Sequence, residues 1–124
     1  MFDMNGLKYI NDNYGHTEGD KALEVISGCI LKTARNSMYA YRVGGDEFIV
    51  IANKNTEEEI ISTIERFKVS LFKTNYHCSI GYAYRADKST PTIDLLKQAE
   101  VMMYKDKEEF YENSSFERRK ALHN

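Results

Sequence analysis

Residues that could form covalent cross-links or rigid turns are scarce in this sequence. It contains two cysteines, one proline and no tryptophan in 124 residues. The cysteines, Cys29 and Cys78, are too few for a disulfide framework and too far apart for a paired metal knuckle. We therefore expect a reduced, cytoplasmic domain in which both cysteines are small buried apolar residues.

An excess of charge of one sign is also missing. Lys and Arg number 17 and Asp and Glu number 19, so the formal net charge is -2. This balance gives no electrostatic reason to expect a nucleic acid or an acidic membrane surface as a partner. No apolar run approaches the ~20 residues of a membrane-spanning helix, and the first residues lack the pattern of a signal peptide. With 42% hydrophobic and 29% charged residues, the composition is that of one globular domain able to bury its own core.

Glycine is present at 7 positions, and these are unevenly placed. Gly6, Gly15 and Gly19 lie near the amino end, and Gly44 and Gly45 are adjacent. Glycine marks backbone that takes a positive φ or lies close against a ligand. One interpretation is that these glycines form ordinary turns and helix caps. The other is that they form two loops that together hold a ligand.

The spacing of apolar residues predicts alternating helices and strands. Helices are expected over residues 7–14, 19–35, 57–73 and about 91–109, and strands over 39–43, 48–52 and 77–84, with 1–5 as the end of another strand. This alternation, with one tight hairpin, predicts an α/β (α+β) sandwich with a mixed central sheet flanked by helices. Residues 112–124 form a polar tail, in which Ser114 and Glu117 are candidates to cap a last helical turn.

Local signals refine these elements. Capping boxes are expected at Thr17 with Asp20 and at Thr56 with Glu59, and Thr90-Pro91 suits the start of the last helix. The Gly44-Gly45 pair signals a hairpin turn, and the apolar run 48–52 is typical of a strand covered on both faces. The expected apolar helix faces are Leu7, Ile10 and Tyr14 in the first helix and Leu95, Leu96, Ala99, Met102 and Met103 in the last.

Three acidic residues adjoin the special backbone positions. Asp3 ends the first strand segment, and Asp46 and Glu47 follow the glycine pair. If the first strand pairs with the hairpin, Asp3 converges on Asp46, and the carboxylates repel unless a cation joins them. Mg²⁺ fits, because it takes one or two carboxylates and fills its octahedron with water and substrate phosphates. The alternative is that Asp46 and Glu47 are solvated turn residues.

The segment between Gly6 and Asp20 suggests a nucleotide. The N–H groups of Gly6 and Leu7 at a helix start would face an anion, and Lys8 would reach a phosphate as a point charge. A carboxylate that accepts from both N1–H and the 2-amino group of guanine would disfavour adenine, which lacks both donors. Asn11 and Asp20 are candidates for reading the base. Ordinary surface exposure of Lys8 and helix capping by the other two are the alternatives.

These segments together resemble the GGDEF family of diguanylate cyclase domains. The matching runs are Asp3-Met4-Asn5-Gly6-Leu7-Lys8-x-Ile10-Asn11-Asp12, Gly15-His16-x-x-Gly19-Asp20 and Arg42-x-Gly44-Gly45-Asp46-Glu47-Phe48. Ser79-Ile80-Gly81 and Ala99-Glu100-x-x-Met103-Tyr104-x-x-Lys107 match later blocks of the family. The resemblance covers about residues 1–107, and the joint pattern is far more specific than any motif within it.

The resemblance implies a fold like the palm of nucleotide polymerases and nucleotidyl cyclases, with the signature on the hairpin. It implies condensation of two GTP into cyclic di-GMP with release of two pyrophosphates, supported by Mg²⁺ or Mn²⁺. Each domain would hold one GTP, so the active form would be a homodimer. A sensor domain upstream in a longer parent protein is also expected. The alternative is a weak or inactive GGDEF domain that binds GTP or a cyclic dinucleotide as a regulatory module.

The family's roles carry over residue by residue. The implied metal ligands are Asp3, the Met4 carbonyl, Asp46 and Glu47. The implied substrate contacts are Gly6, Leu7, Lys8 and Lys107 to phosphates, Asn11 and Asp20 to guanine, and Gly44-Gly45 as the turn against which substrate lies. Asp46 or Glu47 would assist deprotonation of the attacking 3′-hydroxyl, although deprotonation without a protein base is equally consistent.

The sequence also departs from the family pattern. Tyr111 stands where the family carries an arginine, and Asn5 stands where Asp is common. Met38 replaces the acid of the Arg-x-x-Asp product-inhibition motif that begins at Arg35, which predicts weak or absent product inhibition. Arg66 matches a further arginine of that site. For both Arg35 and Arg66, however, the favoured interpretation is a place on the solvated surface of a helix. Residues 1–111 would correspond to a GGDEF domain without its N-terminal helix and most of its first strand.

Overall fold

The computed structural model describes residues 1–113, and these divide into two compact units. The central unit comprises Met4–His77, and the terminal unit joins Met1–Asp3 to the residues from Cys78 onward. The predicted cap at Ser114 and Glu117 lies outside the described residues.

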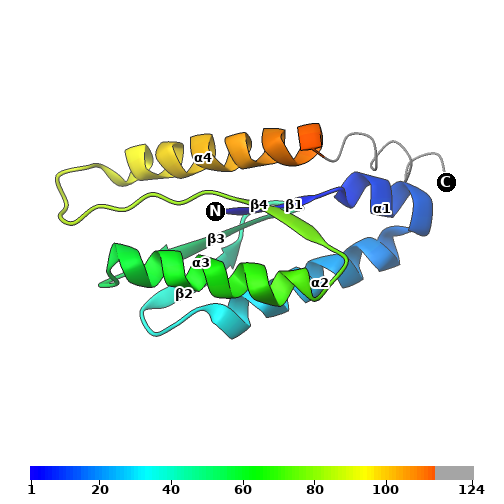
Figure 1. Cartoon of the computed structure of the whole chain (residues 1–124), viewed down its shortest axis with the longest axis horizontal. Helices are drawn as coiled ribbons and strands as arrows, with labels where there is room; N and C mark the ends of the chain where they lie inside the picture. The colour runs from blue at the N-terminus through cyan, green and yellow to red at the C-terminus, as the bar shows by residue number, and fades with distance from the viewer. Residues whose placement is uncertain (114–124) are drawn as a thin grey trace. The chain divides into compact units, whose positions relative to one another are not determined.

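Helices and strands alternate along the chain (Figure 1). They are β1 (Phe2–Asn5), α1 (Leu7–Tyr14), α2 (His16–Thr33), β2 (Met38–Arg42), β3 (Glu47–Ala52), α3 (Glu57–Phe72), β4 (His77–Ile80) and α4 (Thr92–Asn113). The strands form one sheet in the order β2-β3-β1-β4. The α/β sandwich is confirmed, but the sheet is antiparallel rather than mixed, because β1 lies beside β3, the returning strand of the hairpin, and not beside β2.

In the central unit, α2 packs against α3 and both bury apolar faces. The buried side chains include Ala22, Ile26 and Ile30 of α2 and Phe67 and Leu71 of α3. The α3 start is held by the predicted capping box: Glu59 N donates to Thr56 Oγ1 at 3.1 Å, and Thr56 N donates to Glu59 Oε1 at 3.2 Å. This local prediction is confirmed because both partners lie within one helical turn.

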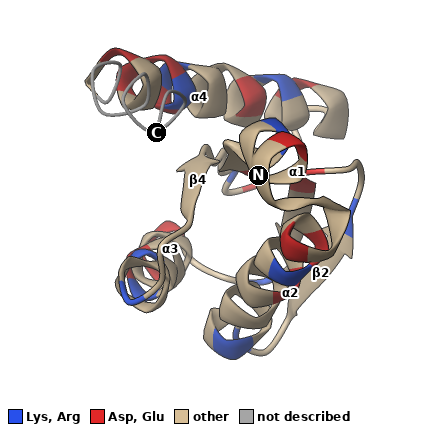
Figure 2. Cartoon of the chain, turned by 90° about the vertical axis from the view of Figure 1, so that its right-hand side faces the viewer, with Lys and Arg blue, Asp and Glu red and all other residues tan. Residues whose placement is uncertain are grey.

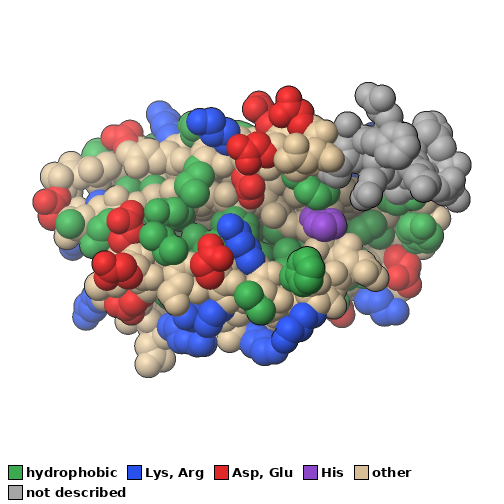
Figure 3. Space-filling view, in the orientation of Figure 1, with side chains coloured by type: hydrophobic (Ala, Val, Ile, Leu, Met, Phe, Trp, Pro, Cys, Tyr) green, Lys and Arg blue, Asp and Glu red, His purple; other side chains and the backbone are tan. Residues whose placement is uncertain are grey.

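Other local predictions in the central unit are wrong. The cap of α2 is Gly15, and no side chain caps it, so Thr17 and Asp20 form no capping box. The strand β3 is not covered on both faces, since Ile51 is 54% exposed and its register partner Tyr39 is 57% exposed. The expected apolar face of α1 is not buried either, and Tyr14 is 65% exposed. Hydrophobic side chains also lie among charged ones on the surface seen in Figure 3.

The terminal unit is built by α4 and the end of β4. Met1 and Gly81 exchange backbone hydrogen bonds of 2.8 and 3.0 Å, as in an antiparallel pair. A Cβ on Gly81 would lie 3.0 Å from Met103 Cα and would clash with Ala99 O and Met103 N. The backbone of α4 thus occupies the space beside Gly81. The strand ends at Ile80, short of the predicted residue 84.

Helix α4 differs from its prediction at both ends. The Pro91 carbonyl accepts from Asp94 N and Leu95 N at 3.1 and 3.3 Å, so the helix begins after Pro91 and continues to Asn113. Of its expected apolar face only two residues are buried, Ala99 and Met103. Acidic and basic residues both occur along its length (Figure 2).

The two cysteines differ in burial. Cys29 is buried as expected, whereas Cys78 is only half-buried. Within residues 1–113, no helix combines the length and the apolar character that crossing a bilayer requires.

Candidate functional site

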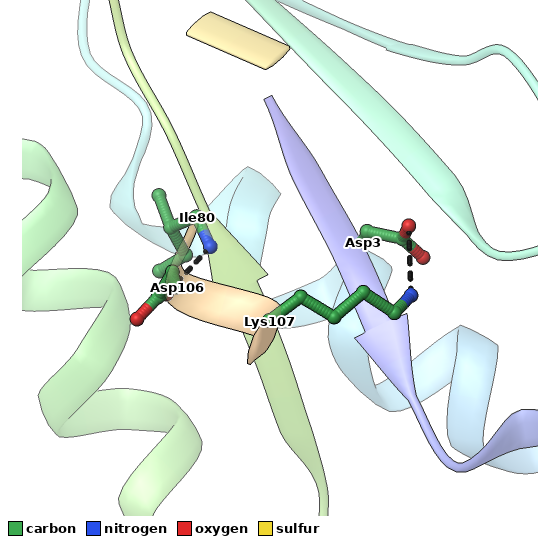
Figure 4. A network of polar contacts seen from close by, with 4 residues as sticks. All are labelled: Asp3, Ile80, Asp106 and Lys107. Atoms are coloured by element: carbon green, nitrogen blue, oxygen red, sulfur yellow. Dashed lines mark hydrogen bonds and ion pairs between the residues drawn. The ribbon is translucent and has the colours of Figure 1, made fainter. Parts of the chain in front are cut away.

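A polar network in the terminal unit connects α4 to two strands (Figure 4). Lys107 Nζ donates to Asp3 Oδ2 at 3.0 Å. The preceding residue, Asp106, accepts from the backbone N–H of Ile80 at 2.9 Å. Two consecutive residues of α4 therefore hold the helix to β4 and to β1 at Asp3, which lies within the strand and does not end it as expected.

The Asp3 carboxylate is a buried charge. The residue is 7% exposed, and a carboxylate so placed needs a cation or hydrogen bonds to offset its desolvation. Lys107 supplies such a cation and remains partly accessible, with 26% of its side chain exposed. The Asp3 carboxylate is thus paired with a positive charge, and the Lys107 ammonium group that supplies it is partly exposed to solvent.

The donor chemistry fits a hard divalent cation. Mg²⁺ binds oxygen ligands, takes only one or two protein carboxylates and keeps its remaining positions for water and phosphate. The buried Asp3 carboxylate, which is paired with the Lys107 ammonium group, matches this preference for a small number of protein carboxylates. Among residues 1–113, no group of three or more His, Cys, Asp or Glu side chains is gathered closely enough to hold a metal by itself.

The hairpin loop between β2 and β3 is longer than a two-residue turn. Arg42 pairs with Phe48 in the register, and Val43 N donates to Glu47 O at 3.0 Å. Positive φ among the described glycines is confined to Gly6 and Gly15. The predicted hairpin is therefore confirmed, with Gly44-Gly45 in its loop. Its turn is not the two-residue primed type, because that turn needs glycine at positive φ.

Arg42 shapes this loop, and sequence reasoning assigned it no role. Its Nε donates to Gly44 O at 3.2 Å and its Nη2 to Gly45 O at 2.7 Å. Met4 N donates to Asp46 O at 2.8 Å, which joins the loop backbone to β1. The sequence did contain a signal for this role. Arg42 lies two residues before Gly44, close enough for its guanidinium group to reach the carbonyl groups of the turn.

The glycines of the loop are not required by the fold. Both are exposed. A Cβ on Gly44 would meet only Glu47 Cβ at an ordinary 3.7 Å, and one on Gly45 would meet nothing within 4 Å in the described part of the chain. Neither φ nor packing therefore calls for glycine here, and the backbone of the loop is exposed.

The corner between α1 and α2 carries the other predicted residues. Gly6 begins α1 at φ 78°, and no side chain caps this helix start. Lys8 and Asp20 are exposed and Asn11 is half-buried. A Cβ on Gly19 would lie 2.9 Å from Asn11 Cγ and would clash with Asn11 Oδ1. The Asn11 carboxamide thus lies against the residue that precedes Asp20.

Comparison with known proteins supports the resemblance. Residues 1–113 match the family described as "Diguanylate cyclase, GGDEF domain". The chain is 36% identical over 81 residues to "Diguanylate cyclase DosC" of Escherichia coli strain K12, covering 65% of this chain and 18% of that protein. It is 29% identical over 114 residues to "Cyclic di-GMP phosphodiesterase PdeR" of the same strain, covering 86% and 17%.

The fold matches a solved structure as well. The GGDEF domain of DgcB from Caulobacter crescentus, in complex with c-di-GMP, aligns with a TM-score of 0.77 at 24% identity, over 86% of this chain and 69% of that one. The chain spans less than a fifth of the length of the two curated relatives, 17% and 18%. With nearly its whole length matched by one family, the chain belongs to the GGDEF domain family.

Proposed function

We propose that this domain is a diguanylate cyclase that condenses two GTP into cyclic di-GMP and releases two pyrophosphates. The observation that carries the proposal is the loop at residues 44–47. Its two glycines are exposed and required neither by backbone conformation nor by packing, and Asp46 and Glu47 follow them directly. Such a loop offers bare backbone to a substrate beside two carboxylates.

Asp3, the Met4 carbonyl, Asp46 and Glu47 would hold Mg²⁺ or Mn²⁺. The buried Asp3 carboxylate with its ammonium partner supports this assignment. A divalent ion bound there would offset negative charge that develops on the transferred phosphoryl group. Lys107 is then available to a phosphate oxygen, as Lys8 is from its exposed position on α1.

The remaining roles follow from the chemistry of the residues. The N–H groups of Gly6 and Leu7 stand at the start of α1 and suit a phosphate. Asn11 and Asp20 would read guanine, and Asp46 or Glu47 would accept the proton of the 3′-hydroxyl. Each domain binds one GTP, so two copies must face each other, and proximity supplies much of the rate.

The proposal also covers the cellular location of the domain and the control of its activity. The domain would act in the cytoplasm, where Cys29 and Cys78, both free thiols, stay reduced. A sensor domain in a longer parent chain would control dimer formation.

The test is incubation of the purified chain with GTP and Mg²⁺, with cyclic di-GMP measured by chromatography. Asp46→Asn keeps the size of the side chain and removes its charge, so we expect product formation to fall at least a hundredfold. Glu65→Gln, an exposed acid on α3, is the control and should keep full activity. Product formation should also rise more steeply than linearly with protein concentration. A folded wild-type chain that forms no product would overturn the proposal.

A regulatory module is the second candidate, and Tyr111 favours it. The ring of this residue packs edge-on against Phe110 with centroids 5.1 Å apart, so it supplies no cation where the family has an arginine. Calorimetry separates the two candidates. Binding of GTP or cyclic di-GMP without turnover would favour the module, whereas turnover of GTP would exclude it.

A further inference from the structure

We propose that Gly19 is a positioning residue for base recognition, because its missing side chain leaves the space that the Asn11 carboxamide fills, against the residue that precedes Asp20. The inference rests on the proposed function, in which Asn11 and Asp20 read guanine. It adds a residue that contacts no nucleotide itself and acts through Asn11.

The backbone of the α1–α2 corner fixes the positions of the two residues. Gly15 joins the helices at φ 92°. Its N–H donates to Asn11 O at 3.0 Å, and its carbonyl accepts from Gly19 N at 3.2 Å. Asn11 and Gly19 are therefore anchored to the same residue from opposite sides, and their separation changes little.

Within this frame the Asn11 side chain fills the space above Gly19. Gly19 is buried, and a Cβ there would clash with Asn11 Oδ1, lie 2.9 Å from Asn11 Cγ and lie 3.3 Å from Leu7 Cδ1. Any residue larger than glycine must turn the carboxamide away. Asp20 is the next residue along α2, so the same contact sets the position of the amide relative to that carboxylate.

A purely structural role for Gly19 predicts a different outcome. The atoms in the way are side-chain atoms of Asn11 and Leu7, and these can rotate without moving a helix. Alanine also favours helix formation more than glycine does. We therefore expect Gly19→Ala to leave the fold intact and to displace the Asn11 carboxamide selectively.

The consequence is a loss of base discrimination. A displaced amide forfeits its hydrogen bond to guanine, which corresponds to about a tenfold loss of GTP affinity for one such bond. Binding of ATP, which does not present the guanine edge, should stay unchanged because the phosphate contacts are untouched. The ratio of GTP to ATP affinity should therefore fall about tenfold.

The experiment is calorimetric titration of the full chain with GTP and with ATP in Mg²⁺. The variants are Gly19→Ala, Asn11→Ala, the double variant and Gly28→Ala. Gly28 is a matched control, since it lies in the same helix and a Cβ there would meet nothing within 4 Å of the described residues. Gly19→Ala and Asn11→Ala should weaken GTP binding to similar degrees, the double variant should be no worse than Asn11→Ala, and Gly28→Ala should bind as wild type does.

Each outcome decides between two ideas. If wild type binds GTP no better than ATP, the proposed function and this inference both fail. If wild type prefers GTP and Gly19→Ala keeps that preference, only the role of Gly19 is overturned. If Gly19→Ala unfolds and Asn11→Ala restores its fold without restoring discrimination, the steric coupling is supported. A double variant that binds GTP tenfold more weakly than Asn11→Ala would overturn it.

Discussion

Gly81 in the terminal unit and Gly45 in the hairpin loop show two different reasons for a glycine. At Gly81 the backbone of α4 approaches so closely that a Cβ would strike Ala99 O and Met103 N. At Gly45 a Cβ would meet nothing within 4 Å among the described residues. The first glycine is required by the domain itself. The second is required neither by packing nor by backbone conformation among the described residues.

The same contrast holds for the charged residues. Asp3 is buried and holds Lys107 at 3.0 Å, so this pair is ordered by the terminal unit alone. Lys8 and Asp20 in the central unit are exposed. Groups of the first kind should contribute measurably to the free energy of unfolding, and groups of the second kind should matter only when ligand is present.

Gly81→Ala should give the largest change in stability. The obstacles are main-chain atoms of α4, which cannot rotate away, so α4 must shift, and we expect a loss of about 3 kcal/mol from overpacking. Urea denaturation followed by circular dichroism measures it. Shortening the neighbouring side chain with Met103→Ala should not rescue the variant, and a rescue would show that the crowding comes from side chains instead.

Contacts between neighbouring residues were easier to predict from the sequence than contacts between distant ones. The capping box of Thr56 and Glu59 was predicted because both partners lie within one helical turn. The end of β4 was misjudged because the alternation of apolar residues continues to Tyr84 in the sequence, whereas the strand ends at Ile80. The Asp3–Lys107 pair joins residues 104 positions apart. Asp3 was marked as a site residue by its place near the glycines and by the family resemblance, whereas Lys107 was marked by the resemblance alone.

Lys107→Met should give the second largest effect. It leaves the Asp3 carboxylate without its ammonium partner, at a cost of about 2 kcal/mol, below that of a fully buried pair because 26% of the Lys107 side chain is exposed. If Asp3 binds a divalent ion, Mg²⁺ should restore part of this loss and stabilise the variant more than wild type. Thermal denaturation with and without Mg²⁺ measures both. Lys105→Met, at an exposed position on the same helix, should show neither effect.

Thr56→Ala tests a contact between two residues of the domain that is exposed to solvent. Its effect on the free energy of unfolding should be smaller than that of Lys107→Met. Loss of the N-cap should lower the free energy of unfolding by about 1 kcal/mol. The Thr56 backbone N–H, followed by the Asn55 side chain and the Thr56 hydroxyl, lowers the pKa of Glu59. The resulting stability is present above the ordinary pKa of Glu and is lost as the pH falls through the lowered value. Between those two pH values the variant should lose slightly less stability than wild type, because it lacks the hydroxyl but keeps the backbone N–H, the largest cause of the lowered pKa of Glu59. A greater loss in the variant than in wild type would contradict the assignment.

Gly45→Ala should change stability least and separates the two kinds of glycine most sharply. Its Cβ has open space and its φ is not positive, so the free energy of unfolding should change by less than about 0.5 kcal/mol. Turnover of GTP should nevertheless fall more than tenfold, because a methyl group would stand where substrate lies against the loop. Gly28→Ala, equally open but within α2, should keep full turnover. A destabilisation comparable to that of Gly81→Ala would mean that the loop is packed against the domain after all, and unchanged turnover would remove Gly45 from the substrate surface.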